Sequence, residues 1–144
     1  MKYIVLVSHG NLAPGFENAL RMLAGSKRED ILSVGLKEDT GADGFSKELE
    51  EKLEVVKPED EVLLYGDIIG GSPLTTAANV ISQKGLLGQT HMVGGVNLPF
   101  ILASALMKDN LETGTLIDTL ISEARGALQT FEVSLDDEAS DDEI

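Results

Sequence analysis

Four short apolar runs, each of strand length, recur along the chain and are separated by longer segments of helical periodicity. They occupy residues 3–7, 31–36, 62–65 and, more weakly, 91–93. The runs are continuous rather than alternating, which is typical of strands buried on both faces of a parallel sheet. This feature predicts an α/β fold with the strands in a central layer.

The segments between the runs place apolar residues on one helical face. The repeating sets are Phe16, Ala19, Leu20 and Leu23; Phe45, Leu49, Leu53 and Val56; and Leu74, Ala77, Ala78 and Ile81. Residues 98–107 are apolar nearly all round, and residues 116–128 form a last amphipathic segment. The resulting order β-α-β-α-β-α-β-α-α predicts an open, doubly wound sheet of four parallel strands in the order 2-1-3-4, flanked by helices.

The C-terminal part of the chain divides into two segments of different character. Residues 130–135 alternate polar and apolar side chains, which is typical of a half-exposed strand at a sheet edge. Residues 136–144 hold six carboxylates and no basic residue, so a disordered acidic tail is expected. We therefore expect one domain over residues 1–135 and a tail over residues 136–144.

Charge and composition exclude several classes of function. The chain carries 11 Lys and Arg against 25 Asp and Glu, a formal net charge of −14, which disfavours nucleic acid and anionic membranes as partners. It has no cysteine, which removes disulfides, thiolate metal sites and thiol nucleophiles. No metal or other cofactor is predicted.

Two apolar stretches bear on targeting and membrane insertion. The first run is too short for a signal peptide, so a cytoplasmic location is expected. Residues 85–107 lack acidic and basic residues but contain four glycines, Asn97 and Pro99, which indicates a buried strand, loop and helix rather than a membrane span.

Polar residues follow the first and third predicted strands at their carboxyl ends. His9 ends the first and Asp67 follows the third. In the order 2-1-3-4 these strands are neighbours, so the two side chains are expected side by side at the point where strand order reverses. A carboxylate that accepts a hydrogen bond from one ring nitrogen fixes the imidazole tautomer and leaves the other nitrogen as a nucleophile.

The segment after Asp67 has the composition of an anion-binding turn. Gly70 and Gly71 allow close approach of backbone N–H groups to an anion, and Ser72 and Pro73 are suited to cap and open a helix whose N-terminus favours negative charge. A histidine that faces such a turn is a candidate phosphoryl acceptor.

Structural explanations exist for each feature taken alone. His9 fits a polar loop residue, Asp67 a loop cap, and the glycine pair a simple turn. Their joint placement on one predicted rim favours the functional interpretation. The other histidine, His91, has no acidic neighbour in sequence and is predicted to be structural.

Other chemistries have little support. Leu74 stands where a serine hydrolase elbow needs glycine, and the chain has neither a phosphate-binding loop with its lysine nor a dinucleotide fingerprint after the first strand.

Three motifs together resemble the enzyme IIA domain of the mannose family of the bacterial sugar phosphotransferase system. They are Val7-Ser8-His9-Gly10, Asp67-Ile68-Ile69-Gly70-Gly71-Ser72-Pro73 and Gly94-Gly95-Val96-Asn97-Leu98-Pro99. They occur in the expected order, and the resemblance covers about residues 1–130.

The resemblance implies a phosphocarrier. His9 would accept a phosphoryl group from phospho-HPr and pass it to a histidine of the IIB component, which serves the membrane components IIC and IID. Asp67 would orient His9, and Ser72 with the amides of Gly70 and Gly71 would hold the phosphoryl oxygens. It also implies a homodimer in which residues 130–135 form an antiparallel edge strand exchanged between subunits, with the IIB component on a separate chain.

Two alternatives remain open at this point. A sister branch with the same histidine serves dihydroxyacetone kinase, although it usually lacks the second and third motifs kept here. The chain is also compatible with a non-catalytic regulatory module of the same fold. The transported sugar is left open.

Overall fold

The computed structural model describes residues 1–135. Within them, four parallel strands form one sheet in the order β2-β1-β3-β4. The strands are β1 (Lys2–His9), β2 (Ile31–Leu36), β3 (Glu61–Gly66) and β4 (Thr90–Gly94). The predicted fold class and strand order are confirmed, and β1, β3 and β4 extend past the apolar runs that indicated them.

Five α-helices and two short 3₁₀ turns connect and follow the strands within the same residues. The helices are α1 (Leu12–Ala24), α2 (Gly41–Lys52), α3 (Ser72–Gln83), α4 (Leu98–Met107) and α5 (Thr113–Gly126). The 3₁₀ turns are η1 (Leu53–Val55) and η2 (Leu87–Gln89). In the described part of the chain, no helix has both the length and the apolar character needed to cross a bilayer.

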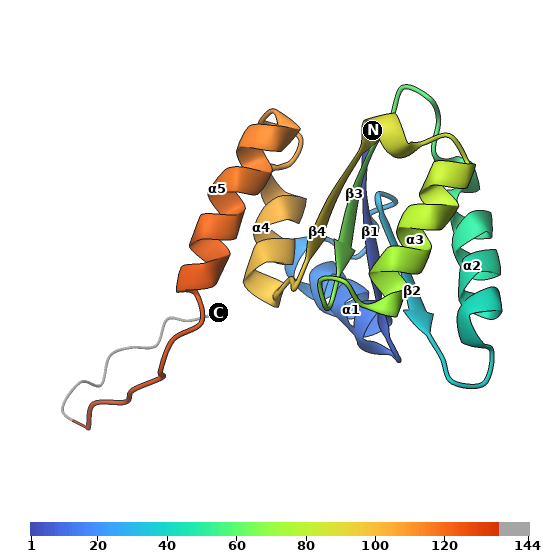
Figure 1. The fold of residues 1–144 in the computed structure, drawn as a ribbon. Coiled ribbons are helices and arrows are strands. Elements are labelled where there is room, and N and C mark those ends of the chain that lie inside the picture. The colour runs from blue at the N-terminus through green and yellow to red at the C-terminus, as the bar shows by residue number, and fades with distance from the viewer. Residues whose placement is uncertain (136–144) are drawn as a thin grey trace.

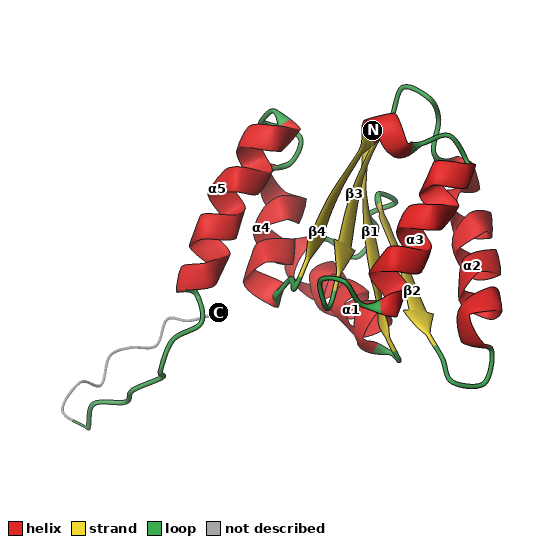
Figure 2. Ribbon diagram, viewed as in Figure 1, coloured by secondary structure: helices red, strands yellow, loops and turns green. Residues whose placement is uncertain are grey.

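The helices cover the two faces of the sheet, as Figures 1 and 2 show. Alternate residues of β1 point to opposite faces: Val5 packs with α2 and α3, whereas Ile4 and Leu6 pack with α1, α4 and α5. Burial of these strand residues on both sides explains why their sequence runs are continuous rather than alternating.

The carboxyl ends of the strands meet at one rim, where β1 and β3 lie side by side. The chain turns sharply after β1 because Gly10 adopts a φ of 55° and donates its N–H to the carbonyl of Leu36. The buried hydroxyl of Ser8 accepts a hydrogen bond from the N–H of Ala13 and so ties this turn to α1. His9 is thereby presented at the end of its strand.

The C-terminal segment of the described chain extends away from the sheet (Figure 1). Residues 128–134 form neither helix nor strand, and Phe131 and Val133 are exposed. The edge strand expected over residues 130–135 is therefore not formed within residues 1–135, where no strand pairs with this segment. Its exchange between two subunits remains a prediction, and the expected acidic tail, residues 136–144, lies outside the described residues.

Candidate functional site

The structure brings His9 and Asp67 together at the rim. Nδ1 of His9 lies 2.9 Å from Oδ2 of Asp67. Asp67 follows β3 immediately, and β3 is paired with β1 up to Gly66, so the parallel register sets this distance. The imidazole is half-exposed, with 49% of its side chain accessible, whereas the Asp67 side chain is only 9% accessible.

The carboxylate of Asp67 is held on both oxygens. Oδ2 also accepts the backbone N–H of His9 at 3.0 Å, and Oδ1 accepts the backbone N–H of Ile68 at 3.0 Å. Burial alone raises the pKa of Asp67, but the hydrogen bonds from His9 and Ile68 outweigh it and leave the pKa below its usual value. The carboxylate is therefore ionised at neutral pH and acts only as an acceptor.

This geometry fixes the tautomer of the neutral imidazole. Because an ionised Asp67 can only accept, the proton of neutral His9 sits on Nδ1, and the lone pair is on Nε2. A ring that is oriented at one nitrogen and half-exposed to solvent is suited to attack an electrophile on another molecule.

The turn after Asp67 forms one wall of the site. Gly70 has a φ of 76°, a backbone conformation that favours glycine. A Cβ on Gly71 would lie 3.3 Å from Cε1 of His9, so the backbone of Gly71 is in close contact with the ring. Gly71 therefore lies beside the imidazole, one residue beyond Gly70 in the same turn.

The hydrogen-bond donors of this turn differ in part from those expected from the sequence. The N–H of Gly71 donates to the carbonyl of Ile68 at 3.2 Å, so it already has a partner in the turn. Gly71 is also the N-cap of α3, and Ser72 is its exposed first residue without a capping hydrogen bond from its side chain. The expectation that Ser72 caps the helix was wrong, and its hydroxyl stays available to a ligand.

A depression of about 540 Å³ opens on the other side of His9. It is lined by Gly10, by Leu36 at the end of β2, and by Lys37, Glu38, Gly41 and Ala42. The three motifs contain no lysine or arginine, so the sequence did not indicate that Lys37 borders the site. The only available signal was its place directly after the second strand, next to β1 in the order 2-1-3-4.

His91 lies in β4 away from this pair and has no carboxylate within hydrogen-bonding distance among the described residues. Its Nδ1 atom is buried without a hydrogen-bond partner in that part of the chain. No group of three or more potential metal ligands occurs within residues 1–135.

Comparison with known proteins places this arrangement in context. Residues 3–121 match the model of a family described as PTS system fructose IIA component, EIIA-man. The chain is also similar to the PTS system fructose-specific EIIA component of Bacillus subtilis (strain 168), with 24% identity over 126 residues, which span 88% of this chain and 84% of that protein.

Solved structures share the fold. The mannose/sorbose specific IIA subunit of the phosphotransferase system from Enterococcus faecalis superposes with a TM-score of 0.77 at 24% identity, covering 93% of this chain and 98% of that one. The phosphotransferase system component EIIA from Streptococcus agalactiae gives a TM-score of 0.75 at 20% identity, covering 90% and 97%.

Proposed function

Since this chain belongs to the mannose-type EIIA family of the sugar phosphotransferase system, we propose that His9 is its phosphoryl carrier, loaded by phospho-HPr and unloaded to a histidine of a IIB component. The observation that carries the proposal is the hydrogen bond between Nδ1 of His9 and Asp67, which leaves Nε2 as the free nucleophile. Only one other histidine, His91, is present in the chain, and its Nδ1 atom is buried.

The transfer is a direct displacement at phosphorus between two imidazole rings and needs no cofactor. The Nε2 lone pair of His9 attacks the phosphorus of the donor phosphohistidine, the donor P–N bond breaks, and its electron pair returns to the donor imidazole. His9 keeps its proton on Nδ1, so the phosphorylated ring carries a positive charge. The ionised carboxylate of Asp67 stabilises that charge at 2.9 Å, and it does the same in the transition state of the return step.

The phosphoryl oxygens would be held at the N-terminus of α3. The amide of Gly70, the amide and hydroxyl of Ser72, and the positive end of the helix dipole favour a dianion there. The Gly71 amide would have to share its hydrogen with the Ile68 carbonyl, which makes it a weaker donor than the sequence indicated. A site made of amide donors and one hydroxyl binds a phosphoryl group weakly enough to release it, as a carrier must.

We further propose that the working form is a homodimer in which residues 130–135 of each subunit pair antiparallel with the free edge of β4 of the other. Among the described residues, β4 is paired on one side only, with β3. Phe131, Val133 and Leu135 alternate with polar residues and are between 71% and 97% exposed in the single chain. Residues 130–135 can therefore supply the strand that the unpaired edge of β4 lacks, and this edge can supply their ladder partner.

The function is tested by transfer in a reconstituted system. The protein is loaded with phosphoenolpyruvate, enzyme I and HPr, isolated, and mixed with either a mannose-family IIB component or dihydroxyacetone kinase. Loss of phosphate to IIB supports the proposal, and loss only to the kinase system favours the sister branch. No loading by HPr would favour a regulatory module.

A further inference from the structure

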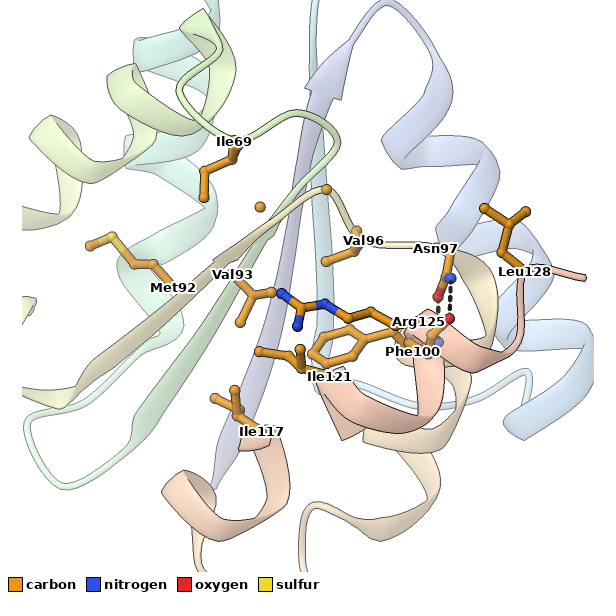
Figure 3. Close-up of a pocket in the computed structure, with 13 residues that line it drawn as sticks. Ile69, Met92, Val93, Val96, Asn97, Phe100, Ile117, Ile121, Arg125 and Leu128 are labelled. Carbon is orange, nitrogen blue, oxygen red and sulfur yellow. Dashed lines mark hydrogen bonds between the residues drawn. The ribbon is translucent and has the colours of Figure 1, made fainter. Parts of the chain in front are cut away.

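An apolar groove of about 500 Å³ runs along β4 and reaches the rim of the sheet (Figure 3). One side is lined by Ile117 and Ile121 of α5 and by Leu128 just beyond it, and the other by Val93 and Phe100. At the rim end the groove is bordered by Ile69, which belongs to the turn between Asp67 and Gly71 and is 77% exposed. One turn of chain thus borders both the groove and the site at His9.

Ile69 is seated on the end of β4. A Cβ on Gly94 would lie 2.6 Å from Cα of Ile69, so the backbone of the turn rests directly on the last residue of that strand. On its other side the same turn approaches the ring of His9, where a Cβ on Gly71 would lie 3.3 Å from Cε1. Ile69 and Gly71, two residues apart, thus connect the end of β4 with the wall that faces the imidazole.

The groove is complementary to residues 130–135 of a second copy. Its lining is apolar apart from Asn97 and one charged residue, Arg125, whose guanidinium lies across the groove toward Val93. The segment 130–135 presents Phe131, Val133 and Leu135 at every second position and carries one charged residue, Glu132. Apolar periodicity favours this occupant, because a strand that turns these three side chains into the groove directs Glu132 away from it.

We propose that Ile69 is a positioning residue through which the second subunit completes the site: residues 130–135 of the second copy cover Ile69 and hold the turn 67–71 against His9. This proposal rests on the homodimer under the proposed function. In the single chain, Ile69 exposes most of its side chain, and its backbone rests on Gly94 of β4. Covering the side chain removes apolar area from water and restricts the turn at the same time.

The test uses a double-mutant cycle in the full-length chain. The arm variant, Phe131→Ser with Val133→Ser, removes two of the three apolar side chains of residues 130–135, and Ile69→Ser removes the apolar side chain on the turn. All three residues are exposed in the single chain, so neither variant removes a buried core side chain. Val55→Ser, at an apolar side chain that is 52% exposed and lines neither the groove nor the depression beside His9, is the control.

Two readouts are measured for each variant. The maximal rate and KM of phosphorylation by phospho-HPr report the site, and hydrogen exchange of the amides of residues 68–71 reports the turn without requiring activity. We expect the arm variant and Ile69→Ser each to lower the maximal rate about fivefold or more with KM unchanged, and to speed exchange. Ile69→Val should restore both.

The combined variant decides the question. If the second subunit acts through Ile69, adding Ile69→Ser to the arm variant causes no further loss, whereas independent effects multiply. Multiplying effects, a rise in KM alone, or a monomeric wild-type protein in sedimentation would each overturn the proposal. If the wild-type protein is a dimer but takes no phosphate from HPr, the proposed function fails while the exchange readout still tests the positioning role.

Discussion

Asp67 reaches the imidazole of His9 from 58 residues along the chain, and the same carboxylate oxygen binds both Nδ1 of the ring at 2.9 Å and the backbone N–H of His9 at 3.0 Å. This double contact fixes the ring relative to its own backbone. It also keeps the carboxylate ionised, because both hydrogen bonds favour the charged form. The proposed role of Nε2 as the nucleophile depends on this pair.

Asp67→Asn should therefore slow phosphorylation without unfolding the protein. The amide group can donate to Nδ1, which moves the lone pair of the neutral ring away from Nε2 and leaves the positive charge unsupported. We expect a rate loss of at least about tenfold in rapid-quench phosphorylation by phospho-HPr, a modest bound beside the roughly 10⁴-fold effect of the wrong tautomer in a catalytic triad. Asp43→Asn, an exposed carboxylate on α2, is the control, and equal rates in the two variants would remove Asp67 from the mechanism.

Gly71→Ala should impair the site and leave stability nearly unchanged. Gly71 has a φ of −76°, which alanine adopts freely, but the added methyl group would lie 3.3 Å from Cε1 of His9. We expect slower phosphorylation with an unchanged thermal midpoint. Gly15→Ala in α1, where the methyl group meets nothing within 4 Å, should leave the rate alone. A wild-type rate in Gly71→Ala would show that the ring has more room than the structure gives it.

The proposed exchange of residues 130–135 makes a separate prediction about assembly. Removing residues 130–144 should shift the protein from dimer toward monomer in sedimentation velocity, because the apolar groove along β4 and the strand edge lose their proposed occupant. The parallel sheet and both cores lie outside the deleted residues, so the far-ultraviolet circular dichroism should keep its shape. An equally tight dimer after truncation would exclude the exchange.

A buried ion cluster at the opposite end of the sheet predicts a pH-dependent stability. Oδ2 of Asp30 lies 2.7 Å from Nζ of Lys108, which is 1% exposed, and 2.9 Å from Nη2 of Arg28. Burial raises the pKa of Asp30, but the hydrogen bonds from Arg28 and Lys108 outweigh it and hold the pKa far below its usual range. Asp30→Asn leaves the buried ammonium without its main partner and should lower the free energy of unfolding at pH 7 by about 3–5 kcal/mol.

The sign of that pH dependence follows from the lowered pKa. The stabilising contribution of Asp30 is fully present above the pKa of an unfolded aspartate, about 3.9, and is lost as the pH falls toward the lower pKa of the folded state. In urea titrations, the difference between wild type and Asp30→Asn should be constant from pH 7 to about pH 5 and shrink in more acid solution. A difference that grows on acidification would contradict this assignment. Asp118→Asn, exposed on α5, is expected to have little effect at any pH.

Much of the fold could be predicted because the central strands β1 and β3 are buried on both faces. Val5 and Leu6 point to opposite cores, so both must be apolar, and the run is visible in the sequence. The strand ends are less visible in the sequence: β1 continues to His9 because its pairing with β2 extends past the apolar residues. The periodicity of residues 130–135 predicts a strand, but it does not specify whether the ladder partner belongs to the same chain.

The site was predictable in its side chains and less so in its backbone. His9 and Asp67 could be paired because strand order places their strand ends together. That the N–H of Gly71 is already bonded to Ile68 depends on the turn geometry, which glycine leaves open in the sequence. Lys37 was missed because it lies outside the motifs and reaches the site only through the pairing of β2 with β1.

The most direct measurement is ³¹P NMR of the protein loaded by phospho-HPr, since phosphate on Nε2 and on Nδ1 of histidine resonate differently. We predict a single phosphohistidine signal of the Nε2 type that is absent from His9→Ala and unchanged in His91→Ala. A signal of the Nδ1 type, or one that survives in His9→Ala and disappears in His91→Ala, would contradict the account.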